Sequence, residues 1–197
     1  MIIFFVVPGV RAISLERPDS LKAKLKSTAT FSLNSNGISS IPAFSLGKPA
    51  IIAEIKLSKI RFSYEPVLAY GLNMRGWFID NWLRYKLVDK PKFELRTGVN
   101  FSTFFSEYKL PDDEIWRTER YFAFELTGIH KLSPTSSLLV SYWNDRGQEK
   151  GSLTGHFFNF IAEKNDIPLG RSILFSGYFQ LFYVDYNGNN DGLFISP

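Results

Sequence analysis

Long segments in which apolar and polar residues alternate restrict the fold of this 197-residue chain more than any other feature. In residues 60–73, every even position is apolar or aromatic, and most odd positions are polar or small. The same period of two recurs over residues 92–106, 115–129 and 172–185, with exceptions at Phe104, Leu174 and Phe182. Successive side chains of a β-strand point to opposite faces, so this period predicts strands. We therefore expect an all-β chain.

Turn residues divide the chain into about eleven expected strands. These strands are residues 28–33, 38–46, 50–57, 60–73, 77–88, 92–106, 115–129, 137–143, 153–162 and 172–185, with a last one starting near Leu193. The short connections between them are rich in Gly, Pro, Asn and Asp, which favour turns. Longer polar connections are expected at residues 107–114, 144–151, 163–170 and 185–192. Consecutive strands joined in this way predict an antiparallel up-and-down sheet.

Strand length and the aromatic residues favour a lipid environment for this sheet. Segments of about 15 residues exceed the five or six that are common in soluble strands and suit a tilted membrane strand. Tyr and Trp residues gather near segment ends, as expected at the two water interfaces of a bilayer. They are Tyr64, Trp77, Trp82, Tyr85, Tyr108, Trp116, Tyr121, Trp143, Tyr183 and Tyr186. We therefore expect a transmembrane β-barrel, with a soluble β-barrel as the alternative.

The two ends of the chain suggest how it is organised. An apolar run from Ile2 to Val7, followed by small residues at Val10 and Ala12, predicts a signal peptide over residues 1–12. The alternative is an N-terminal strand. Residues 13–26 are expected to be a linker and residues 27–197 the barrel domain. Because bacterial barrels have even strand numbers, an odd count and an end inside a strand predict a truncated barrel, open at its C-terminal end.

Several kinds of chemistry find no support in the residues. A net charge of +4 with both signs mixed gives no basic block for nucleic acid, and the absence of Cys excludes disulfides and thiolate sites. His130 and His156 have no serine two positions away, as a lipid hydrolase would need. Residues 187–192 resemble a calcium loop but lack its final Glu, so a turn is expected. We expect no enzyme activity, no cofactor and no metal.

Charged residues gather on the expected polar faces of the central strands. They are Arg61, Glu65, Asp80, Arg84, Lys86, Glu94, Arg96, Arg117, Glu119 and Glu125. If these faces line the lumen of a barrel, three roles are open. The charges form a structural network of cross-strand pairs, they line an aqueous pore and set its selectivity, or they bind a polar ligand.

Four stretches of the chain carry a resemblance to known proteins: GISSIPAFSLGKP (residues 37–49), RFSYEP (residues 61–66), GWFIDNWLRYKLV (residues 76–88) and GLFIS (residues 192–196). They resemble a porin-like group of outer-membrane β-barrel proteins of Gram-negative bacteria. The resemblance implies a place in the cell outer membrane, with the lipid bilayer and the barrel assembly machinery as partners. It supplies no catalytic or ligand-binding residue.

The leading functional hypothesis is a porin-like passive passage for small polar solutes. Two alternatives stay open. One is a structural or adhesive barrel with a plugged interior. The other is a soluble, lipocalin-like β-barrel that binds an apolar ligand.

Overall fold

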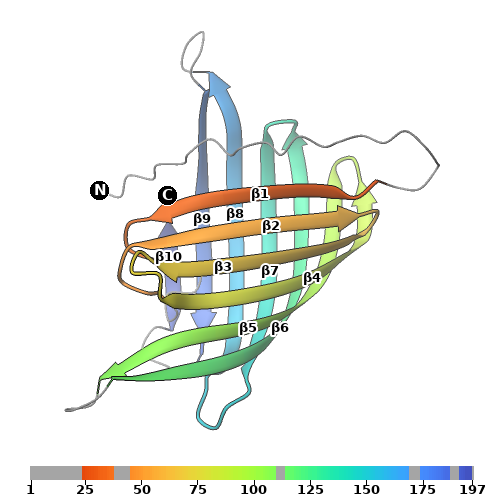
Figure 1. Ribbon diagram of the computed structural model, residues 1–197. Helices are drawn as coiled ribbons and strands as arrows, with labels where there is room; N and C mark the ends of the chain where they lie inside the picture. The colour runs from red at the N-terminus through yellow and green to blue at the C-terminus, as the bar shows by residue number, and fades with distance from the viewer. Residues whose placement is uncertain (1–23, 38–44, 110–113, 169–173, 187–190, 197) are drawn as a thin grey trace. The chain divides into compact units, whose positions relative to one another are not determined.

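The computed structural model describes residues 24–37, 45–109, 114–168, 174–186 and 191–196, and in these residues it contains ten strands and no helix (Figure 1). The strands are β1 (Lys26–Asn34), β2 (Ala50–Lys59), β3 (Phe62–Gly71), β4 (Gly76–Lys90), β5 (Phe93–Lys109), β6 (Glu114–Ser133), β7 (Ser136–Gly147), β8 (Thr154–Pro168), β9 (Leu174–Asp185) and β10 (Gly192–Ser196). No helix in the described part of the chain is long and apolar enough to cross a membrane.

The strands pair in sequence order, from β1 at one end of the sheet to β10 at the other. Each strand is therefore hydrogen-bonded to its neighbours along the chain, and the expected antiparallel up-and-down sheet is confirmed. Within the described residues this order has two end strands and does not close on itself. The strand expected at residues 38–46 lies mostly outside the described residues, and Ser45 and Leu46 are not part of a strand.

Several strands extend into segments that the sequence suggested were connections. β5, β7 and β8 continue through parts of residues 107–114, 144–151 and 163–170. In β8 the pairing with β9 shifts between Lys164 and Ile167, where Asp166 has a positive φ of 54°. A bulge of this kind adds a residue to one strand and moves the alternation out of step. The alternation of apolar and polar residues therefore ends before the end of strand β8.

The connections differ in length. Those after β2, β4 and β6 have two residues each, at Ile60–Arg61, Pro91–Lys92 and Pro134–Thr135. The others are longer, at residues 35–49, 72–75, 110–113, 148–153, 169–173 and 186–191. Because the strands are antiparallel, the connections after even-numbered strands lie at one strand end and those after odd-numbered strands at the other. The three two-residue turns thus share one end.

The described residues belong to two compact units, which are treated separately here. The first unit falls within Met1–Arg84, Asn100–Phe122 and Gly147–Ser152, and the second within Tyr85–Val99, Ala123–Arg146 and Leu153–Pro197. β4, β5 and β6 contribute one part to each unit.

A small aromatic core holds the first unit together. Ala50 of β2 and Ala69 of β3 are fully buried and leave room for the rings of Trp77 and Phe78. Phe104 packs on Phe78, with ring centroids 5.4 Å apart. Phe104 broke the alternation in the sequence because it adds an aromatic ring to a face that is otherwise polar.

A row of aromatic rings crosses four strands of the second unit. Trp143 of β7, Phe157 of β8, Phe182 of β9 and Phe194 of β10 follow one another with centroids 5.0, 5.8 and 5.2 Å apart. Phe157 and Phe182 are buried. Phe182, which like Phe104 is an exception to the alternation, is therefore also an aromatic residue on the buried face.

Tyr186 connects the end of β9 to β7 across β8. Its hydroxyl donates a hydrogen bond to the Asp145 carboxylate, and its ring lies over Gly155. A Cβ atom on Gly155 would lie 2.7 Å from Cγ of Tyr186 and would also overlap the backbone oxygen of Asp185. The absence of a side chain at Gly155 is what lets the ring cross.

Candidate functional site: the charged buried face

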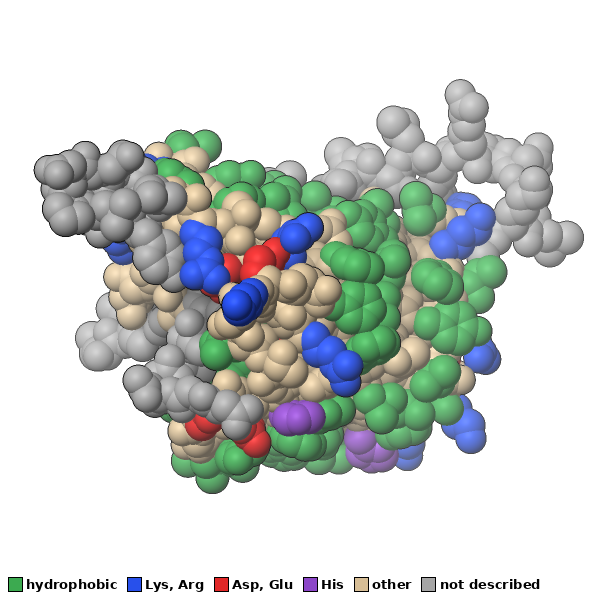
Figure 2. All heavy atoms as spheres, turned by 90° about the horizontal axis from the view of Figure 1, so that it is seen from below, with side chains coloured by type: hydrophobic (Ala, Val, Ile, Leu, Met, Phe, Trp, Pro, Cys, Tyr) green, Lys and Arg blue, Asp and Glu red, His purple; other side chains and the backbone are tan. Residues whose placement is uncertain are grey.

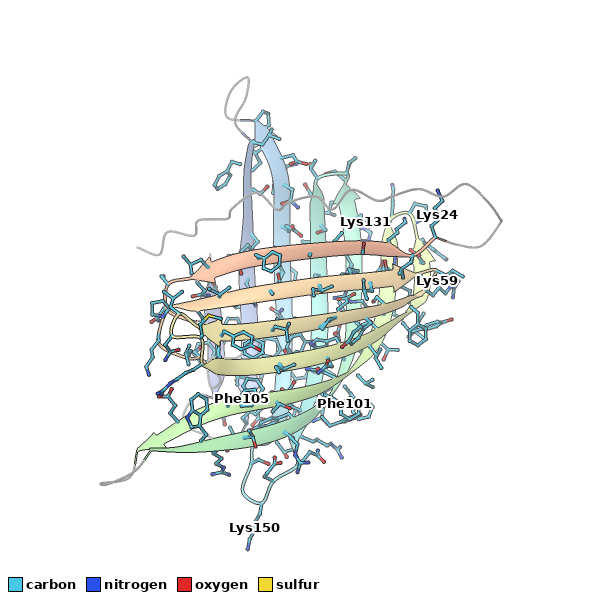
Figure 3. All side chains as sticks on the ribbon, in the orientation of Figure 1. Lys24, Lys59, Phe101, Phe105, Lys131 and Lys150 are labelled. Carbon is cyan, nitrogen blue, oxygen red and sulfur yellow. The ribbon has the colours of Figure 1, made fainter. Side chains whose placement is uncertain are left out.

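The two faces of the sheet carry the reverse of the usual soluble pattern. In the second unit, Glu125 and Thr127 of β6 are 3% and 1% exposed, while Phe124 and Leu126 between them are 50% and 49% exposed. In the first unit, Asn100 and Ser102 of β5 are buried and Phe101 is exposed (Figure 3). Polar residues therefore lie on the buried face and large apolar residues on the exposed face.

The surface reflects this arrangement. In the view of Figure 2, hydrophobic side chains cover broad areas, and acidic side chains lie beside basic ones. Exposed large apolar side chains occur in both units, on strands as well as in turns. Contiguous exposed apolar area on this scale marks a surface that contacts something other than water.

Glu65 is the centre of the charged group in the first unit. Its carboxylate lies 2.8 Å from Nζ of Lys56 on β2 and 2.6 Å from Nη1 of Arg84 on β4. The Ser63 hydroxyl donates a third bond, of 2.7 Å. Three neighbouring strands are thus joined through one carboxylate on their shared face.

Asp80 is next to this group on β4. Its carboxylate accepts a hydrogen bond of 2.5 Å from the Ser102 hydroxyl, which in turn accepts one of 2.6 Å from the side-chain amide of Asn100. The Arg84 guanidinium lies 4.2 Å from the centroid of the Trp82 ring. The cation is therefore held between a carboxylate and an aromatic face.

The second unit contains two further ion pairs on its buried face. Nε of Arg96 on β5 lies 3.1 Å from Glu125 on β6, and the Thr127 hydroxyl donates to the same carboxylate oxygen at 2.6 Å. Nζ of Lys86 on β4 lies 2.7 Å from Glu94 on β5. Lys86 is 35% exposed, so water reaches this pair, whereas the Glu125 side chain is 1% exposed.

The remaining charges from the sequence analysis are Arg117, Glu119 and Arg61. Arg117 and Glu119 on β6 lie 3.2 Å apart, and Tyr121 donates to Glu119 at 3.1 Å. Arg61 lies in the two-residue turn between β2 and β3 and is exposed. The alternation had assigned Arg61 to a strand, and this placement is wrong because the turn begins at Ile60.

The aromatic residues expected at the water interface differ in exposure. Tyr64, Tyr85, Trp116 and Tyr183 are exposed, Trp143 is half-buried, and Trp77, Trp82, Tyr121 and Tyr186 are buried. The side chain of Tyr108 lies outside the described part of the structure, and the placement of these residues at a bilayer interface stays a prediction. Trp82, Tyr121 and Tyr186 share a face with polar residues, where Trp82 packs on Arg84 and Tyr186 bonds to Asp145. Position near a strand end does not reveal which face a residue takes.

The set of charged residues named from the sequence leaves out several contacting members of this face. Lys56, Asn100, Ser102 and Thr127 each contact one of the expected charges. Lys56 was identifiable, because it lies in an expected strand among neighbours that alternate with apolar residues. The hydroxyl and amide residues carried no charge to single them out.

The face offers hydrogen-bonding groups and charges of both signs. Among the described residues, no three His, Asp or Glu side chains lie close enough together to hold a metal ion. Comparisons with protein-family models, with curated proteins and with solved structures give no match.

Proposed function

We propose that the chain forms the wall of an outer-membrane β-barrel, whose charged buried face lines a porin-like passage for small polar solutes. The observation that carries this proposal is the reversal of faces along single strands, as in Phe124, Glu125, Leu126 and Thr127 of β6. A membrane barrel presents apolar residues to lipid and polar residues to its interior.

The free energies favour lipid over water around the exposed face. Each Å² of apolar surface left in water costs about 25 cal/mol relative to an apolar environment. A soluble barrel with an apolar ligand would place its large apolar residues inside and its charges outside. Glu125 and Arg96 are on the wrong face for such a protein, which argues against the lipocalin-like alternative.

The connection lengths suggest an orientation. Outer-membrane barrels have short periplasmic turns and longer extracellular loops. We assign the two-residue turns at residues 60–61, 91–92 and 134–135 to the periplasmic side. The connections after β1, β3, β5, β7 and β9, including residues 148–153, are then extracellular.

A plugged barrel is the second candidate, and a specific observation favours it. The buried face also carries large aromatic residues, among them Phe78 and Trp82 in the first unit and Phe157 and Phe182 in the second. Rings of this size fill space that a passage needs.

The exposure of two lysines on the buried face favours the open passage instead. The side chains of Lys56 and Lys86 are 46% and 35% exposed, so part of the face is open to water and to solutes.

An arginine scan of the exposed face tests the membrane environment. Phe124→Arg at the centre of β6 is expected to lower the free energy of unfolding in lipid vesicles by about 2–4 kcal/mol. Leu72→Arg, in the connection after β3, is the matched control and should change stability by less than about 0.5 kcal/mol. A Phe124→Arg protein that is as stable as the parent, and that stays in solution without detergent, would contradict the proposal.

Conductance separates the passage from the plug. Full-length protein reconstituted into planar bilayers is expected to show ion conductance, and its folded form should migrate differently from its boiled form on gels. Folded, membrane-inserted protein without conductance would support the plugged barrel. Protein that shows neither conductance nor a difference in gel migration would contradict both the open passage and the plugged barrel.

A further inference from the structure

Two lysines of the second unit face each other at the strand end that carries the two-residue turns, which we call the short-turn end. Lys92 is the second residue of the turn between β4 and β5, and Lys131 lies in β6 (Figure 3). The backbone N–H of Lys131 donates a hydrogen bond of 2.9 Å to the backbone oxygen of Lys92. Because β5 and β6 are neighbours in an antiparallel sheet, this bond places the two residues opposite each other. Residues in this arrangement have Cβ atoms about 5 Å apart.

This lysine pair continues the charged buried face at the short-turn end. Lys131 lies four positions after Thr127 in β6, so the two side chains take the same face of the strand. Thr127 is on the buried face together with Glu125. Lys92 shares that face because it is opposite Lys131. Both lysines are exposed, whereas Thr127 is 1% exposed, so the buried face meets water at this end.

The carboxylates nearest in sequence to Lys92 are already paired with another lysine. Glu94 lies 2.7 Å from Nζ of Lys86, and Asp89 lies 3.3 Å from the same atom. Within the described part of the chain, the side chains of Lys92 and Lys131 form no hydrogen bond or ion pair. Like charges directly opposite each other in a ladder repel and destabilise the pairing. An anion between the two ammonium groups would offset this repulsion.

We infer that the lysine pair binds the phosphate group of a small solute at the short-turn end of the passage. The inference rests on the proposed function, because it takes the buried face as the lining. A phosphate monoester carries a charge of about −1.5 to −2 at pH 7 and three acceptor oxygens, which suits two ammonium groups with three donors each. Lys90, the last residue of β4, is a further exposed cation at the same turn.

The face on which the lysine pair lies favours a solute over a lipid headgroup as the source of the phosphate. Glu125 and Thr127, which share this face, are buried, whereas Phe124 and Leu126 on the other face are about half exposed. In the proposed barrel the second of these faces meets lipid. A phosphate that reaches the lysine pair therefore comes from the aqueous side of the sheet.

Backbone amide NMR of the full chain, folded in micelles without phospholipid, provides the test. Sodium phosphate is added at constant ionic strength, and sodium acetate serves as the singly charged comparison. We expect the amide signals of residues 92 and 131 to shift with phosphate until they saturate, and phosphate to bind more tightly than acetate. Lys131→Gln should raise the Kd for phosphate by about threefold, and the double variant Lys92→Gln/Lys131→Gln by about tenfold.

Lys164→Gln is the matched control. Nζ of Lys164 donates to the Thr135 hydroxyl, in the turn after β6, so this lysine is at the same strand end. It alternates with Phe158 on the exposed face of β8, and its loss should leave the Kd for phosphate unchanged. Signals that do not saturate, or an equal Kd in the parent and the double variant, overturn the inference. Competition by phosphatidylglycerol added to the micelles would assign the site to a lipid headgroup and overturn the solute.

The phosphate titration and the conductance measurement fail separately. Parent protein that conducts ions without a saturable phosphate response defeats this inference alone. Folded parent protein that binds phosphate through the lysine pair, but does not conduct in planar bilayers, defeats the open passage and supports the binding site. The amide spectrum of each variant before titration shows whether it is folded. Because both lysines are exposed, their substitution by Gln should leave that spectrum folded.

Discussion

Two carboxylates on the buried face, Glu65 in the first unit and Glu125 in the second, differ in how far water reaches their ion pairs. Glu65 lies against Lys56 and Arg84, and the Lys56 side chain is 46% exposed. Glu125 lies against Arg96, with side chains 1% and 19% exposed. A desolvated pair depends strongly on its partner charge, whereas an exposed pair contributes little. The same kind of contact thus has different consequences in the two units.

The largest expected effect is on the second unit. Arg96→Met removes the cation next to Glu125 and keeps a side chain of similar length. A carboxylate that stays buried without that charge should lower the free energy of unfolding by about 3–5 kcal/mol. Urea titration of the folded protein in lipid vesicles measures the change. A loss below about 1 kcal/mol would mean that Glu125 does not depend on Arg96 for its stability in the folded protein.

Gly155→Ala tests the other buried contact of the second unit. The added methyl group overlaps the Tyr186 ring and the Asp185 backbone oxygen, and overpacking of this kind costs about 1–3 kcal/mol. Gly128→Ala on β6 is the control, because its Cβ would meet only the Phe93 ring, at an ordinary 3.8 Å. The same urea titration should show little change for the control. Equal effects of both substitutions would show that Tyr186 does not need the space at Gly155.

The matching substitution in the first unit should have a smaller effect. Lys56→Met leaves Arg84 and Ser63 against Glu65, and the exposed lysine is screened by water. The expected loss of unfolding free energy is about 0–1 kcal/mol, measured as for Arg96→Met. A loss as large as that of Arg96→Met would erase the difference between the two units.

The smallest effect concerns pH, at a pair between Arg120 of β6 and Glu149 in the connection after β7. Hydrogen bonds from the Arg120 guanidinium and backbone N–H, of 2.7 and 2.8 Å, hold the pKa of Glu149 below its ordinary value. A lowered pKa in the folded state means that this contact stabilises the protein above the unfolded-state pKa and is lost as pH falls through the folded-state pKa.

Arg120→Gln should raise the pKa of Glu149 toward its ordinary value, as followed by carboxyl NMR from about pH 2 to about pH 6. Lys150→Gln, next to Glu149, serves as the control and should leave the titration of Glu149 in place. A titration that is unchanged in Arg120→Gln would assign the shift to another cause.

The period of two was sufficient to predict the all-β up-and-down sheet, because it depends only on the geometry of a single strand. It did not reveal strand ends, since a bulge such as that at Asp166 shifts the alternation. Nor could it place Trp82 or Phe182, because a buried face that contains both charges and aromatic rings has no single hydropathy. Pairs such as Arg96 with Glu125 depend on the register between strands, which a single sequence does not contain.

The contact of Tyr186 with Asp145 has a consequence for assembly. Because Asp145 is paired with Gly155, the Tyr186 ring crosses β8 at the residue that lies between Tyr186 and Asp145. Moving β9 along β8 by two residues would keep every side chain on its proper face, and hydropathy alone would not oppose it. That shift would place the ring over Phe157 in place of Gly155 or, in the other direction, over Leu153. Tyr186 therefore acts as a register check, which rejects slipped pairings that the apolar and polar faces would accept.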